Sequence, residues 1–223
     1  MNDIHKDYSL IFDEKTLKRI DEFLDDNEIT PSKCNVFRSL IMPLNDIRIV
    51  ILGQDPYPQI GAATGLAFEV GNLQSWNQSI PQRSLQNIIR LVYKAYFDEW
   101  ITFSEFRKRN IDNIIKPPNE LFKSWFSQGV MLINSALTTI PGNPSSHMNF
   151  WLPIIQRLIN YISLNKKDIK YFLWGSFARN FEQIIHFGEI FKCNHPSRIN
   201  SKNPDDFMYC KCFEETKDLI NWL

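Results

Sequence analysis

Residues 48–58 read Arg48-Ile-Val-Ile-Leu-Gly-Gln-Asp-Pro-Tyr-Pro58, an apolar run followed by a polar turn. The unbroken apolar residues 49–52 are typical of a strand that is buried on both faces, as in a parallel sheet. Gly53 ends the run, and Asp55 stands before a proline that stiffens the turn and holds its carboxylate in one place. Ligands bind at this end of a strand in open α/β sheets. For this stretch alone, an Asp that only satisfies turn amides is the simpler interpretation.

Three further stretches have the character of strands, and helical patterns separate them. Together with the first, they predict strands at residues 47–52, 129–135, 169–176 and 190–194. A strand–helix unit that repeats four times predicts a parallel sheet with right-handed crossovers. The carboxyl ends of parallel strands meet at one edge of the sheet, and polar or small residues stand at all four ends. These residues are Asp55, Asn134, Gly175, Ser176 and His195.

The intervening segments carry amphipathic spacing and residues that favour helix starts. Residues 61–70 are rich in small residues, which suits either close approach to a ligand or a plain loop with a short strand. The chain has no linker or internal repeat, so residues 1–223 are predicted to form one α/β domain. Its central four-stranded parallel sheet is flanked by helices and follows a helical lead-in over residues 1–46. Helices are expected over residues 13–24, 85–97, 117–128, 150–164, 177–185 and 207–222, with a further helix start at residues 30–32.

The composition excludes a membrane-spanning or strongly basic protein. The 223 residues are 43% hydrophobic and 22% charged, as in ordinary soluble globular domains. The formal net charge is zero, so binding to nucleic acid would depend on a local surface rather than on an overall basic field. No apolar run reaches membrane-spanning length, and the first residues lack the charged and apolar regions of a signal peptide. The expected location is cytoplasmic, or nuclear if the source is eukaryotic or viral, with no membrane partner.

The cysteines have neither the spacing of a metal site nor that of a disulfide framework. They are expected to be free thiols in a reducing compartment. The pair at residues 210 and 212 would need a second close pair to hold a metal ion, so no metal site is expected. The four cysteines are Cys34, Cys193, Cys210 and Cys212.

Six short motifs follow one another in the order Gly53-Gln-Asp-Pro-Tyr57, Gly65-Leu-Ala-Phe68, Ser84-Leu-Gln-Asn-Ile88, Leu132-Ile-Asn134, Leu173-Trp-Gly-Ser176 and His195-Pro-Ser197. In this order they resemble the motifs of the family 1 uracil-DNA glycosylases. The resemblance implies a monofunctional glycosylase that hydrolyses the N-glycosidic bond of uracil in DNA, initiates base-excision repair and needs no cofactor. Such an enzyme would flip the base out of the DNA stack in order to reach it.

The resemblance assigns the chemistry to Asp55 and His195. Glycosidic cleavage passes through an oxocarbenium-like state and leaves negative charge on the departing base. Asp55 would stabilise the sugar cation and orient or deprotonate the attacking water. His195, as a neutral imidazole, would donate a hydrogen bond to the developing uracil anion. A histidine that is satisfied within the structure is the alternative interpretation of His195.

By the same resemblance, four residues would bind the base. Asn134 would separate uracil from cytosine through hydrogen bonds to the base edge. Tyr57 would exclude thymine by a steric clash with its 5-methyl group. Phe68 would stack on the base, although a core aromatic is an alternative interpretation of this residue. Gln54 completes the predicted base-binding set.

Neutral donors are expected to hold the DNA, which suits a chain of zero net charge. The hydroxyls of Ser84, Ser176 and Ser197, with neighbouring backbone amides, would bind successive phosphates. Ile199 would be an apolar wedge that fills the gap left by the flipped base, or else an ordinary loop residue. The expected partner is uracil-containing DNA, single- or double-stranded, bound by a monomer, and any inhibitor or replication partner is left unidentified. The predicted DNA-binding set also includes Pro56, Gly175 and Pro196.

The chain departs from the family at three places around the predicted pocket. Pro58 stands where the family usually has a histidine that helps to bind phosphate, and Ala62 replaces a usual polar residue. The family's proline-rich loop is here Ile80-Pro-Gln-Arg83. Two other functions therefore stay open. One is a glycosylase for a modified pyrimidine, against which Tyr57 argues. The other is a DNA-binding accessory protein, against which the intact catalytic pair argues.

Overall fold

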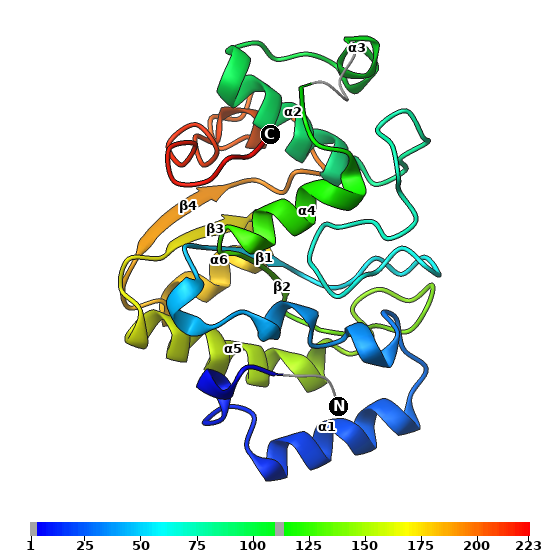
Figure 1. Cartoon of the computed structure of the whole chain (residues 1–223), viewed down its shortest axis with the longest axis vertical. Coiled ribbons are helices and arrows are strands. Elements are labelled where there is room, and N and C mark those ends of the chain that lie inside the picture. Colours follow the sequence, from blue (N-terminus) through cyan, green and yellow to red (C-terminus); the bar gives the residue numbers. More distant parts are fainter. Residues whose placement is uncertain (1–3, 110–113) are drawn as a thin grey trace.

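A computed structural model of the chain describes residues 4–109 and 114–223 and contains a parallel sheet of four strands (Figure 1). The strand order is β2-β1-β3-β4, and each pairing is parallel, which confirms the predicted fold class. Residues 1–3 and 110–113, which the predicted domain includes, lie outside the described residues. The strands are β1 (Ile49–Gly53), β2 (Val130–Asn134), β3 (Lys170–Trp174) and β4 (Glu189–Cys193).

Helices of two kinds connect the strands. The α-helices among the described residues are α1 (Glu14–Asp26), α2 (Arg83–Phe97), α3 (Phe103–Lys108), α4 (Pro118–Ser127), α5 (Met148–Asn165) and α6 (Gly175–Arg179). Short 3-10 helices occupy Lys6–Tyr8, Lys33–Asn35, Arg38–Ile41, Leu44–Asp46, Asn180–Ile184 and Phe207–Tyr209. Within the described part of the chain, no helix is both long enough and apolar enough to cross a membrane.

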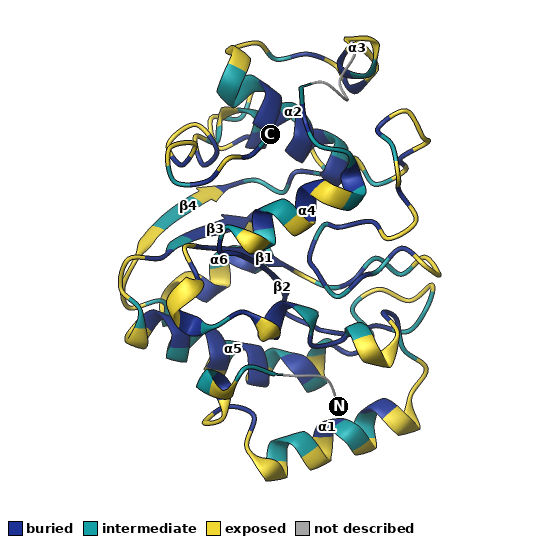
Figure 2. Cartoon of the chain, in the orientation of Figure 1, coloured by how far each residue is buried: buried dark blue, intermediate teal, exposed yellow. Residues whose placement is uncertain are grey.

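The central strand β1 contributes side chains to two separate cores. Ile49 and Ile51 pack with α2, α4 and the C-terminal segment on one face of the sheet. Val50 and Leu52 pack with α1, α5 and the N-terminal segment on the other face. Because successive strand side chains point to opposite faces, an unbroken apolar run is what a doubly covered strand requires. Figure 2 shows the result, with β1, β2 and β3 buried between helices that are exposed on their outer surfaces and the edge strand β4 mostly intermediate or exposed.

Local signals in the sequence determine where three of the helices begin. The carboxylate of Asp13 accepts a hydrogen bond from the Thr16 amide at 2.7 Å and caps α1. Thr102 and Glu105 form a reciprocal capping box at the start of α3. Pro118 occupies the first turn of α4, where its missing N–H costs nothing.

The helix predicted over residues 207–222 is wrong. A 3-10 helix covers only Phe207–Tyr209, and turns follow to the end of the chain. Cys212 and Phe213 are adjacent and both fully buried, and so are Ile220 and Trp222. In a helix, at about 100° per residue, Cys212, Phe213 and Ile220 would share one face, but Trp222 would point to the opposite side, so a helix to residue 222 cannot bury all four against one face of a sheet. Turns can, and tertiary packing therefore overrides the helical spacing.

Three other segments differ from the prediction in detail. Residues 61–70 form turns without a short strand. The helix start expected near residues 30–32 is followed by separate 3-10 helices between residues 33 and 46 rather than an α-helix. The helix expected over residues 177–185 is divided into α6 and the 3-10 helix Asn180–Ile184.

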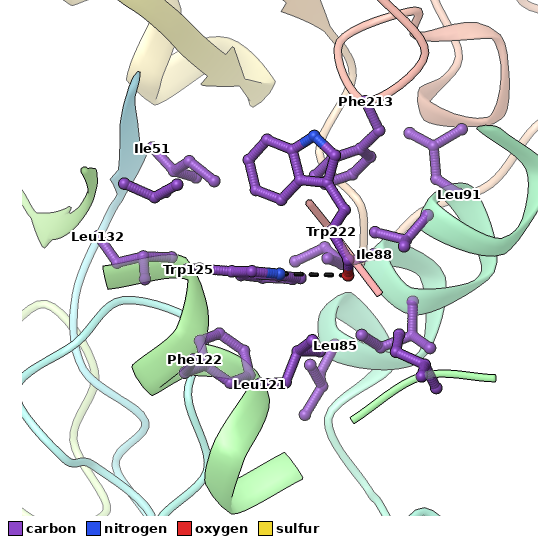
Figure 3. Close-up of a cluster of buried hydrophobic side chains, with 14 of the residues drawn as sticks. Ile51, Leu85, Ile88, Leu91, Leu121, Phe122, Trp125, Leu132, Phe213 and Trp222 are labelled. Atoms are coloured by element: carbon purple, nitrogen blue, oxygen red, sulfur yellow. Dashed lines mark hydrogen bonds between the residues drawn. The ribbon is translucent and has the colours of Figure 1, made fainter. Parts of the chain in front are cut away.

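The C-terminal segment completes the core on the α2–α4 face (Figure 3). Trp222 is fully buried, and its ring packs edge-to-face on Phe213 with the ring centroids 4.8 Å apart. The indole N–H of Trp125 donates to the Trp222 carbonyl at 3.2 Å, the dashed line in Figure 3. The last residues are therefore part of the core rather than a surface tail.

Replacing Trp222 by alanine is expected to lower the free energy of unfolding by about 3–5 kcal/mol, the usual cost of deleting a buried large aromatic side chain. Urea denaturation followed by circular dichroism measures the change. Leu10→Ala is the control, because Leu10 is 70% exposed and its truncation should leave the midpoint almost unchanged. Equal midpoints for wild type and Trp222→Ala would contradict the importance of this packing.

Candidate active site

A cavity of about 210 Å³ opens at the carboxyl end of β1. Its lining includes residues from five of the six predicted motifs, so the fold brings together segments that lie far apart in the sequence. Sites for drug-sized ligands have volumes of about 300–1,000 Å³. This smaller cavity therefore suits a single ring. Residues at the wall include Gln54, Asp55, Pro56, Tyr57, Pro58, Phe68, Ser84, Asn134 and His195.

Asp55 is held by a backbone amide that the sequence did not reveal. The N–H of Ser145 donates to the Asp55 carboxylate at 2.7 Å. Ser145 has a φ of 62°, an uncommon conformation for a residue with a side chain. The side chain of Gln54 donates to the Ser145 hydroxyl at 3.0 Å. Burial raises the pKa of Asp55, and the hydrogen bonds from Ser145 oppose that rise.

Contacts at Nδ1 fix the orientation of the His195 imidazole. The backbone N–H of Ser197 donates to Nδ1 of His195 at 3.2 Å, and the Ser197 hydroxyl lies 2.8 Å from the same atom. Because Nδ1 accepts a hydrogen bond, the proton of the neutral ring belongs on Nε2. Burial, and secondarily the charge of Arg198, lowers the pKa of His195 and favours this neutral form.

Gly53 and Gly175 create space for two of these side chains. Gly53 pairs with Asn134 across β1 and β2, and a Cβ on Gly53 would lie 2.0 Å from the Asn134 side-chain oxygen. A Cβ on Gly175, which has a φ of 90°, would lie 2.9 Å from the Cβ of His195. Glycine at both positions lets the Asn134 amide and the imidazole pack directly against the backbone.

The Tyr57 hydroxyl lies 2.9 Å from the hydroxyl of Ser84, the residue before Leu85 on α2. Burial raises the pKa of Tyr57 to about 12, so the phenol stays neutral. Ser84 is buried and borders the small cavity. The predicted phosphate contact of Ser84 stays a prediction, and its observed partner is Tyr57.

Phe68 lies on a turn that is anchored from outside the cavity. Its φ is 67°, and its ring centroid is 5.4 Å from that of Trp174 in β3. The guanidinium of Arg38 donates to the carbonyl of Thr64 at 3.2 Å and forms an ion pair with Glu69. These contacts hold both ends of the turn. Phe68 is also partly buried against the core, so its two predicted roles are compatible in space.

Three of the remaining predicted DNA-binding residues line a second cavity of about 610 Å³. It shares Gly53, Gln54 and His195 with the first cavity. Gly175, Ser176 and Ser197 line it, whereas Pro196 is buried and Ile199 is partly buried against the core. Of the departures from the family pattern, Ala62 is buried in the core and Pro58 lines the first cavity.

Comparisons with known proteins agree with one another. A family model described as the uracil DNA glycosylase superfamily matches residues 41–219. The uracil-DNA glycosylase of Borrelia turicatae is 35% identical over 181 residues, which cover 79% of this chain and 72% of the relative. That of human herpesvirus 6A is 32% identical over 222 residues, covering 92% of this chain and 79% of the relative.

Solved structures show the same similarity. Mimivirus uracil-DNA glycosylase has a TM-score of 0.67 and 26% identity, covering 87% of this chain and 69% of its own. A variant of the mimivirus protein was solved in complex with UGI. The structure of UNG from Nitratifractor salsuginis has a TM-score of 0.74 and covers 97% of this chain and 92% of its own. Its 20% identity supports the fold alone.

Arg38→Met should lower the free energy of unfolding by about 3 kcal/mol, the lower end of the range for breaking a buried ion pair. Glu69 would lose its ion-pair partner in a largely buried position, since its side chain is 7% exposed and that of Arg38 is 29% exposed. Urea denaturation measures the change. Lys33→Met is the control, because the Lys33–Asp25 pair is exposed and should contribute little. An unchanged stability of Arg38→Met would show that the pair does not hold the turn.

Proposed function

The chain belongs to the uracil DNA glycosylase superfamily, and from that premise we propose that it excises uracil from DNA by hydrolysing the N-glycosidic bond. One observation carries the proposal. A partly buried carboxylate and an imidazole with its proton on Nε2 line the same cavity, which suits one ring. The substrate class follows from the relatives, which are named uracil-DNA glycosylases.

The cavity would accept a base only after it leaves the DNA stack, at a cost of a few kcal/mol. Phe68 would then stack on the ring, and the Asn134 amide would bind its edge. Tyr57 would close the space beside the 5-position, where thymine carries its methyl group. The buried Tyr57–Ser84 contact keeps the phenol ring in place for this purpose.

Bond cleavage would develop positive charge on the sugar and negative charge on the base. The Nε2–H of His195 would donate to the uracil oxygen as that charge appears, and one such preorganised donor is worth about 3–4 kcal/mol. Asp55 would stabilise the sugar cation and orient or deprotonate the attacking water. The N–H of Ser145 fixes one carboxylate oxygen and so restricts the direction of the carboxylate.

The direct test is an oligonucleotide with one uracil, incubated with the protein and then treated with alkali, which cleaves the strand at abasic sites. A product cut at the uracil position is expected from single- or double-stranded substrate. An oligonucleotide with cytosine at the same position is the control. No cleavage of the uracil substrate by folded protein would refute the proposal.

Asp55→Asn should keep the fold and lower the single-turnover excision rate by about 10²–10⁴, the usual contribution of a positioned acid–base group. The amide removes the negative charge while it preserves the size of the side chain. Asp98→Asn, at an exposed position with a φ of 53° that asparagine tolerates, is the matched control. A near wild-type rate for Asp55→Asn would remove Asp55 from the mechanism.

Tyr57→Ala should gain activity on thymine, because it removes the group that would clash with the 5-methyl. Excision from thymine- and uracil-containing oligonucleotides, at a temperature where the variant is folded, measures the gain. Tyr57→Phe is the control, since it keeps the ring and loses only the hydroxyl beside Ser84. If the wild type already accepts bulky 5-substituents, a modified pyrimidine becomes the better substrate assignment.

The excision rate should fall on the acid side as His195 gains a proton and Asp55 becomes neutral. Burial, and then Arg198, lowers the pKa of His195, so Arg198→Gln should raise it. The acid limb of the single-turnover rate, measured at saturating DNA, should therefore move to higher pH. Arg198→Lys retains the charge and should keep the wild-type profile. A shift of the Gln variant to lower pH would contradict this role of Arg198.

A further inference from the structure

Asn87 belongs to the Ser84–Ile88 motif but has no role in the mechanism described so far. It lies on α2, and its side chain is buried. Its amide nitrogen donates to the carbonyl of Pro196 at 2.6 Å, across 109 positions of sequence. Pro196 is the residue immediately after His195. The contact therefore ties α2 to the segment that carries the imidazole.

The orientation of the Asn87 amide is fixed by Arg90. The guanidinium of Arg90 donates to the Asn87 side-chain oxygen at 2.7 Å. Because a guanidinium only donates hydrogen bonds, the oxygen of Asn87 must face Arg90 and its NH2 group must face Pro196. Arg90 is itself anchored, since it donates to the Ile101 carbonyl at 2.5 Å and lies 4.4 Å from the ring centroid of Trp100. The amide cannot rotate without losing one of these bonds.

The same helix holds a second wall of the cavity. Ser84 lies three residues before Asn87, so both side chains project from one face of α2. Ser84 contacts the Tyr57 hydroxyl, and Asn87 contacts the segment of His195. One helix, α2, therefore helps to position both the tyrosine and the imidazole.

We propose that Asn87 is a positioning residue that sets the place of His195 in the cavity through the Pro196 carbonyl, with Arg90 fixing the direction of its amide. The effect of Asn87 on the excision rate rests on the proposed function. A donor to a developing oxyanion must lie within about 2.7–3.1 Å of the place where the charge appears. A small displacement of residues 195–197 would therefore weaken the donor without unfolding the protein.

Asn87→Asp tests the proposal with almost no change in size. The carboxylate still accepts from Arg90, but it turns an oxygen toward the Pro196 carbonyl in place of a donor. The single-turnover rate on the single-uracil oligonucleotide should fall about tenfold or more, yet less than in His195→Ala, while the Kd for that DNA stays within about twofold. Asn165→Asp is the matched control. Asn165 donates to the Tyr161 carbonyl at 2.8 Å on an exposed turn of α5, so its variant should keep the wild-type rate.

Combination with His195→Ala separates positioning from general structural damage. If Asn87 acts through His195, Asn87→Asp should cause no further loss of rate in the His195→Ala background. A loss by the same factor in both backgrounds would overturn the proposal, as would a wild-type rate in the single variant. If Asn87→Asp does not fold, Arg90→Met frees the amide to rotate and should give a smaller loss with the same dependence on His195.

Nitrogen-15 NMR of the His195 ring gives a readout that does not need activity. The Nδ1 and Nε2 resonances should shift in Asn87→Asp and remain in place in Asn165→Asp. Unchanged resonances would overturn the positioning role even if uracil excision is established. A wild type that excises no uracil, with His195 resonances that do respond, would refute the proposed function and leave the positioning role standing.

Discussion

The site depends on the absence of a side chain at the end of the central strand. β1 has β2 on one side and β3 on the other, so its last residue lies beside Asn134 in the β2 register. The Asn134 amide occupies the space that a Cβ of Gly53 would need. Asp55 follows two residues later and reaches the same cavity. The packing of one glycine against one amide thus fixes the distance between the residue proposed to bind the base and the residue proposed to act on the sugar.

Hydrogen bonds from neutral groups orient Asp55, His195 and Tyr57 in the cavity. Ser145 N–H binds Asp55, Ser197 N–H binds His195, and the hydroxyls of Tyr57 and Ser84 meet. Burial raises the pKa of Asp55 and lowers that of His195, so it disfavours the charged form of each. The hydrogen bonds between Ser197 and His195 use Nδ1. The Nε2–H of His195 would therefore be available for the charge that develops in the proposed reaction.

The sequence predicts the central strands well because a strand buried on both faces needs an unbroken apolar run, and such a run can be recognised from the sequence alone. The same rule locates Asp55 and Asn134, whereas His195 follows β4, an edge strand that is mostly not buried. Ser145 could not be found in this way, because its contribution is a backbone N–H that any residue except proline carries. The helix predicted over residues 207–222 failed for a related reason. The apolar residues of this segment pack against a sheet face formed by residues far away in the sequence, and their spacing follows that packing rather than helical periodicity.

The burial of Trp222 has a consequence for the order in which the protein can fold during synthesis. The core on the α1–α5 face draws its buried members from Tyr8 to Phe181, so that face can close before residues 182–223 have emerged. The opposite core needs Phe213 and Trp222. Until they arrive, the core on the α2–α4 face lacks two fully buried aromatic rings, and part of that face of the sheet stays open to solvent. The nascent chain therefore has an apolar surface to protect at the stage when most of the sheet already exists.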